Sequence, residues 1–84
     1  MRGYKLQIAS DVVRDGLGCE LIDNMQEFVA EVFRCDADHT VTINGKLHGV
    51  PLAVVEWFLA EAKTRLDPFE NGSPLSELPA ANER

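Results

Sequence analysis

One run of apolar residues constrains the fold of this chain more than any other feature. Its members recur at helical spacing: Leu21, Ile22, Met25, Phe28, Val29, Val32 and Phe33. Residues three and four positions apart lie on one face of an α-helix, so the run predicts an amphipathic helix over residues 21–33. Acidic residues such as Glu27 and Glu31 lie between the apolar positions. They would form the solvated face of this helix.

Two short segments beside this helix have the character of strands. In residues 4–9 apolar side chains alternate with others, which is the period of a half-buried strand. Residues 40–43 are rich in β-branched side chains, which strands favour. Asn44-Gly45 follows directly. Because both central positions of a tight hairpin turn need a positive φ, this dipeptide predicts a hairpin with a return strand over 46–48.

A second helix is predicted to begin near Pro51, whose missing N–H costs nothing in the first turn of a helix. Asp67-Pro68 would end it. Its apolar stripe comprises Leu52, Val55, Phe58, Leu59, Ala62 and Leu66. We therefore expect one α+β domain over residues 1–67, a small sheet with two helices packed on one face. Residues 68–84 contain several prolines and acidic side chains and are expected to form a flexible acidic tail.

Composition and charge narrow the class of partner. The chain has 84 residues, of which 45% are hydrophobic and 26% charged, as in ordinary globular proteins, and its net charge is −6. A pI near 4.7 disfavours capture by nucleic acid or by an anionic membrane. The sequence shows no signal-peptide pattern and no apolar run of membrane-spanning length. We expect a cytoplasmic location and a protein partner.

Two motifs resemble the histidine-containing phosphocarrier protein (HPr) of the sugar phosphotransferase system. Asp15-Gly16-Leu17 looks like the start of the family's active-site segment, and residues 41–46, Val-Thr-Ile-Asn-Gly-Lys, look like its hairpin. The similarity covers roughly residues 4–60. It implies an HPr-like order of strand, helix, strand, strand and helix, βαββα, with the family's final strand and helix missing.

The departures from that family concern its chemistry. Gly18 stands where the family has its phosphorylated histidine, and Glu20 stands where it has arginine. Glycine carries no nucleophile, and a carboxylate would repel an incoming phosphoryl group. Leu52 occupies the place of the family's regulatory serine. The resemblance therefore implies a degenerate relative that accepts no phosphoryl group, with its former active-site turn at Asp15, Gly16, Leu17, Gly18 and Cys19.

The missing final strand has a consequence for assembly. In the family that strand lies between the first and second strands of the sheet. Without it, residues 4–9 and 40–43 would either pair directly in parallel or leave an open edge. An open edge offers unpaired N–H and C=O groups to a second chain. We therefore expect a homodimer, with residues 4–9 as the exposed strand.

The cysteines and histidines are the candidate reactive groups of this sequence. Cys19, placed at a helix N-terminus, could have a lowered pKa and act as a nucleophile or redox switch, or it could be a small packing residue. Cys19 and Cys35 are expected to be free thiols. His39 and His48 supply too few converging ligands for a metal site, so a solvated polar loop is favoured. No metal, cofactor or catalytic residue is expected.

Three functions remain open on this basis. The first is a non-catalytic, HPr-related regulatory or protein-interaction module. The second is a thiol-dependent activity or redox switch at Cys19. The third is a purely structural module that self-associates.

Overall fold

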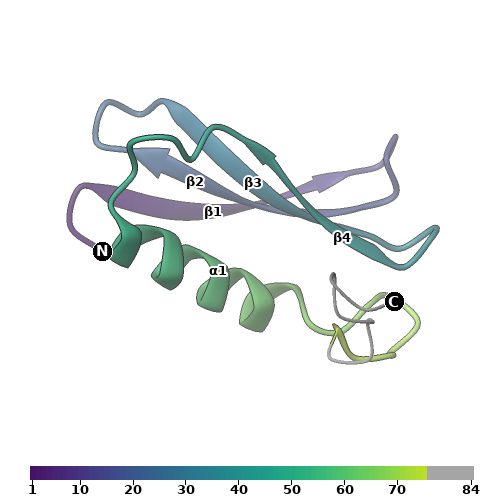
Figure 1. The fold of residues 1–84 in the computed structure, drawn as a ribbon. Helices are drawn as coiled ribbons and strands as arrows, with labels where there is room; N and C mark the ends of the chain where they lie inside the picture. Colours follow the sequence, from purple (N-terminus) through teal and green to yellow (C-terminus); the bar gives the residue numbers. More distant parts are fainter. Residues whose placement is uncertain (76–84) are drawn as a thin grey trace.

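The computed structural model describes residues 1–75, which form four strands followed by one helix. The elements are β1 (Tyr4–Asp11), β2 (Gly16–Asp23), β3 (Phe28–Cys35), β4 (Thr40–Gly45) and α1 (Leu52–Leu66). Each strand pairs antiparallel with the next one, so the sheet has the order β1-β2-β3-β4. Figure 1 shows α1 beneath one face of this twisted sheet.

The predicted α+β class is confirmed, but the predicted arrangement of two helices is wrong. The order is ββββα, not the βαββα that the phosphocarrier resemblance implied. Residues 21–33, predicted as a helix, form the end of β2, a turn, and most of β3. The predicted strands over 4–9 and 40–43 are confirmed as parts of β1 and β4, which lie at opposite edges of the sheet and are not neighbours.

Asp23 makes the turn that replaces the predicted helix. Its Oδ1 accepts the backbone N–H groups of Met25 and Glu27, at 2.8 and 3.0 Å. A carboxylate bonded to the backbone two residues ahead is a recognised turn former, and it competes directly with helical hydrogen bonding. Gln26 adopts a positive φ of 65° at the same place. The chain therefore reverses, and the apolar residues on either side of the turn face one another across two strands.

The core lies between α1 and the two central strands. Residues of β2 and β3 that face the helix are fully or almost fully buried, and the same holds for one stripe of the helix. The cluster consists of Cys19, Leu21, Ala30, Val32, Val54, Phe58, Ala62 and Leu66. Burying a large apolar side chain contributes about 1.5–3 kcal/mol, so this layer is the main source of stability. α1 packs on β2 and β3, and the inward side chains of the edge strands are only partly covered.

The second predicted helix is confirmed as α1, which begins after Pro51 and ends before Asp67. Phe58 is fully buried and its neighbour Trp57 borders the core, because adjacent residues of a helix point about 100° apart. The predicted stripe was misplaced at its start, because Leu52 is 71% exposed and Val54 is buried instead.

Asn44-Gly45 does not form the predicted hairpin, and residues 46–48 do not form a return strand. Gly45 has the positive φ expected of it, 110°, but it uses it to end β4 and lead into the segment before α1. A Cβ atom there would stand 2.5 Å from the carbonyl oxygen of Val29. This close approach of two backbones is what requires glycine at the position.

Arg34 ties the end of α1 to the sheet. Its guanidinium donates to the carbonyl oxygens of Leu66 and Pro68, at 2.8 and 2.7 Å, and to Asp36 at 2.9 Å. The Leu66 carbonyl belongs to the last turn of the helix, where carbonyl groups lack intrahelical donors. The arginine therefore caps the helix from a neighbouring strand.

The first residues of the predicted tail lie against this junction. Phe69 is 3% exposed, and its ring stacks on that of His39 with 4.5 Å between the centroids. Asp36 accepts the backbone N–H of Glu70 at 2.8 Å, and the N–H of Leu75 donates to Asp67. Residues 76–84, the remainder of that tail, lie outside the described residues.

Candidate functional site

The segment predicted as a former active-site turn has a different place in the fold. Asp15 lies in the tight turn between β1 and β2 and has a φ of 59°. Gly16, Leu17, Gly18 and Cys19 form the first half of β2. They do not precede a helix, so no helix N-terminus collects N–H groups around Gly18. Instead, Gly18 lies against the Glu31 side chain, which belongs to a charged network on the outer face of the sheet.

Arg14 is the centre of that network. Its guanidinium makes two hydrogen bonds to the Glu31 carboxylate, at 3.0 and 2.8 Å, and a third to Asp11 at 2.5 Å. It also lies over the ring of Phe33, 3.9 Å from the centroid. A bidentate arginine–carboxylate pair is among the stronger polar contacts in proteins, and stacking on an aromatic face adds to it. This cover explains why Phe33 is buried on the face opposite α1.

Glu31 is an acidic side chain that the sequence pattern placed on a solvated helix face, and it is 6% exposed. Its hydrogen bonds from Arg14 lower the pKa of this carboxyl against the opposing effect of burial, and Asn44 donates a further bond at 3.3 Å. Gly18 makes room for the carboxylate, since a Cβ there would stand 2.5 Å from Glu31 Oε2. The group is held ionised in a fixed position and has its acceptors satisfied.

Cys19 lies at the centre of β2 and faces α1, completely buried. Burial raises the pKa of its thiol, with smaller opposing influence from Arg65. A reactive thiol needs an accessible, electropositive setting and a lowered pKa. Cys35 is half-buried, and both cysteines are free thiols. They lie on adjacent strands, not at the ends of a long helix.

His39 and His48 lie apart in the fold. His39 lies in the β3–β4 connection and stacks on Phe69, whereas His48 lies in the segment between β4 and α1. In residues 1–75, no group of three or more His, Cys, Asp or Glu side chains has the arrangement of a metal site.

Comparison of the chain with protein-family models, with curated proteins and with solved structures found no match. In the part of the chain that the structure describes, no helix is long and apolar enough to cross a membrane.

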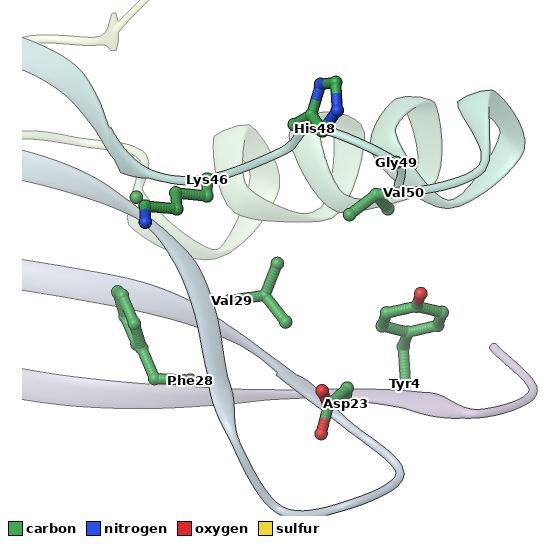
Figure 2. Close-up of a pocket in the computed structure, with 9 residues that line it drawn as sticks. Tyr4, Asp23, Phe28, Val29, Lys46, His48, Gly49 and Val50 are labelled. Atoms are coloured by element: carbon green, nitrogen blue, oxygen red, sulfur yellow. The ribbon is translucent and has the colours of Figure 1, made fainter.

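A shallow cleft of about 540 Å³ lies between one end of the sheet and the segment that leads into α1. Its lining comes from β1, the end of β2, the start of β3, the end of β4 and the loop that follows: Tyr4, Asp23, Phe28, Val29, Gly45, Lys46, His48, Gly49 and Val50. Figure 2 shows Tyr4 and Val29 pointing toward the loop, with Lys46 beside Phe28.

The polar groups of this cleft do not converge on one point. In Figure 2 the His48 ring lies on the far side of the loop from Tyr4 and Val29. The Asp23 carboxylate is already occupied by the two backbone donors of its turn. A small-molecule site needs a few polar groups directed at one ligand. The cleft is therefore a weaker candidate for a binding site than the neighbouring edge strand, β4.

That strand is β4, which lies at one edge of the sheet. Among residues 1–75 it has β3 as its only partner, and it carries no charged side chain from Thr40 to Gly45. Four of its six residues are β-branched, and it contains no proline or bulge. Natural edge strands are normally protected by charges, prolines or bulges. β4 has none of these protections.

β1, at the other edge, is better protected. Lys5 and Asp11 are charged, and Gln7 is held by a hydrogen bond to Glu20 at 2.8 Å. The sequence predicts the exposed edge at residues 4–9, because the resemblance implies that the family's last strand is missing. The absence of charged residues in Thr40–Gly45 is the sequence signal for an unprotected edge at β4. The predicted hairpin at Asn44-Gly45 hides this signal, because it gives residues 40–43 a neighbouring strand over 46–48.

Proposed function

We propose that this chain is a non-catalytic protein-interaction module that binds an extended segment along the edge of β4. The observation that carries the proposal is an uncharged, β-branched edge strand that has an open side among the described residues. Strand addition of this kind obtains affinity from main-chain hydrogen bonds and specificity from alternate side chains. The acidic charge of the chain, −6, agrees with a protein partner and not with nucleic acid.

The backbone of β4 shows which residues would make the bonds. Lys46 donates its N–H to the Val29 carbonyl on β3, at 3.0 Å. Peptide groups of alternate residues in a strand point to opposite sides, so those of Thr42 face β3 as well. The peptide groups of Val41 and Ile43 then point to the open edge. Ile43 is also 47% exposed, so a bound segment would cover apolar surface.

The thiol-dependent alternative receives no support from the position of Cys19. A completely buried thiol with a raised pKa is not an accessible nucleophile. No phosphoryl transfer is proposed either, because the segment around Gly18 is an internal strand that lies under the Arg14–Glu31 pair.

A peptide titration tests the proposal. The ¹⁵N-labelled chain, at a concentration where light scattering shows a monomer, receives a capped peptide of alternating threonine and valine with a lysine at each end. We expect the amides of Val41 and Ile43 to become protected from hydrogen exchange, because they donate to the peptide. The amides of β1 should not change.

The matched control is the same peptide with one central valine replaced by proline. It has the same charge but lacks a main-chain donor and cannot lie flat in a sheet. Equal effects of the two peptides, or changes confined to other strands, would refute binding along β4.

A further inference from the structure

The structure assigns one occupant to the β4 edge: a second copy of this chain, whose own β4 pairs antiparallel with the first about a two-fold axis at Thr42. This inference rests on the proposed function and specifies its partner. It would join two four-stranded sheets into one sheet of eight strands.

Two copies of β4 can pair without repulsion between like charges. In a two-fold pairing the residues of the strand lie opposite residues of the same strand, and a charged side chain at or next to the axis would lie close to its own copy. Thr40–Gly45 contains no charged residue, and such a pairing brings no repulsion within the strand pair. β1 differs from β4 in carrying Lys5 and Asp11, charges of the kind that protect an edge strand from pairing.

The register follows from the direction of the peptide groups. An axis normal to the sheet at Thr42 places Val41 of one chain opposite Ile43 of the other. These are the residues whose peptide groups point to the open edge, and each opposed pair exchanges two N–H···O=C bonds. Four backbone hydrogen bonds form in total. Thr42 then lies opposite its own copy in a non-hydrogen-bonded pair, where the Cα atoms are closest, about 4.5 Å apart.

The same register extends the apolar layer of the fold. Val41 and Ile43 point to the face that α1 covers, since they lie opposite Arg34 and the core residue Val32 on β3. The helix covers β2 and β3 and leaves Ile43 47% exposed. Pairing places Val41 of the second copy against Ile43. A small domain gains more than a large one from additional burial of this kind.

Disulfide trapping tests the register. Thr42→Cys is made in a Cys35→Ser background, where the remaining native thiol, Cys19, is buried. Opposed residues of a non-hydrogen-bonded pair fall within the Cα separation of a disulfide. Under mild oxidation we expect most of the Thr42→Cys chain to become a covalent dimer. Gln7→Cys, exposed on β1, should stay mostly monomeric under the same conditions.

A second pair of variants fixes the axis. Thr40→Cys alone should cross-link poorly, whereas a mixture of Thr40→Cys and Asn44→Cys chains should form the mixed dimer, because these residues lie opposite each other. Efficient self-cross-linking of Thr40→Cys, with none of Thr42→Cys, would refute the Thr42 axis.

Sedimentation of the unmodified chain tests the dimer without cysteines. We expect a species of twice the 9.3 kDa chain mass that dissociates on dilution over a micromolar range. Ile43→Pro, which removes an outward N–H while leaving the bonds to β3, should shift the equilibrium to monomer at least tenfold. Ile43→Val keeps that N–H and should remain a dimer. Retained cooperative unfolding of Ile43→Pro shows that the effect is on pairing.

Failure of this inference is separable from failure of the proposed function. A full-length chain that stays monomeric, with no Thr42→Cys cross-link, refutes self-pairing, and the peptide titration then decides independently whether β4 binds another segment. If dimers form only after deletion of residues 76–84, the edge is occupied by the chain's own segment and self-pairing of the full chain is refuted.

Discussion

Gly16 lies against the ring of Phe33, and a Cβ atom at Gly16 would stand 2.7 Å from Cζ of that ring. The same Cβ would overlap the backbone carbonyl oxygen of Arg34 on β3. A side-chain end can move away from a new methyl group, but a backbone carbonyl within a paired strand cannot without shifting the sheet. Glycine at this position is therefore required by contact and not by an unusual φ.

The first prediction compares two glycines of β2. Gly16→Ala should lower the free energy of unfolding by about 2–3 kcal/mol, the upper part of the range for an overpacked site, because its neighbours are displaced. Gly18→Ala should cost less, because its Cβ meets the end of the Glu31 side chain and not backbone. Urea unfolding followed by Trp57 fluorescence measures both. A larger loss for Gly18→Ala would contradict this ordering.

The charged network on the outer face helps to explain why residues 21–33 resemble a helix in sequence although they form two strands. Seven apolar residues of 21–33 fit a helix because β2 and β3 bury side chains on both faces, so their sequence lacks the strict alternation of a half-exposed strand. Ile22 and Phe33 are 7% and 4% exposed although they face away from α1. The Asp23 turn was the available contrary signal.

β1 and α1 could be predicted because residues close together in the sequence determine their secondary structure. β1 alternates, and α1 has proline at its start and a stripe that a single helix must bury. The position of Glu31 could not be predicted, because its partner Arg14 is 17 residues away and reaches it only after β1 and β2 pair. The sequence predicts an open edge at residues 4–9, and β1 is indeed an edge strand, but β4 at the opposite edge is the one that carries no charged residue.

The second prediction concerns pH. Hydrogen bonds from Arg14 hold the pKa of Glu31 below its ordinary value of 4.5. A depressed pKa contributes stability that is present above the ordinary value and is lost as the pH falls through the folded-state value. Glu31→Gln should therefore destabilise the chain by about 1–2 kcal/mol at pH 7, a reduced figure because Arg14 is partly exposed.

The difference between Glu31→Gln and the natural chain should narrow as the pH falls below 4.5 and through the lower folded-state pKa, because protonation removes the same charge from Glu31. Urea unfolding across this pH range measures the convergence. Glu27→Gln, on an exposed residue of the Asp23 turn, is the control for loss of a carboxylate at the surface. A constant difference between Glu31→Gln and the natural chain at all pH values would contradict the assignment.

The third prediction concerns the two thiols. In the folded chain, iodoacetamide should modify Cys35, which is half-buried, well before Cys19, which is completely buried and has a raised pKa. In urea both should react at similar rates. Mass spectrometry of the alkylated chain counts the modified sites. Rapid modification of Cys19 in the folded chain near neutral pH would restore the thiol-dependent function as a candidate.

The fourth prediction concerns the arginine that caps α1. Arg34→Met should lower the free energy of unfolding by about 3–5 kcal/mol, because it leaves Asp36 as a buried charge without its partner and removes the donors to Leu66 and Pro68. The control is Arg65→Met, whose ion pair with Glu61 is 45% and 41% exposed and should contribute less than about 1 kcal/mol. Both variants keep a long side chain, so the comparison isolates the buried guanidinium. Similar melting temperatures for the two variants would show that the contacts of Arg34 with residues 66–68 do not stabilise the fold.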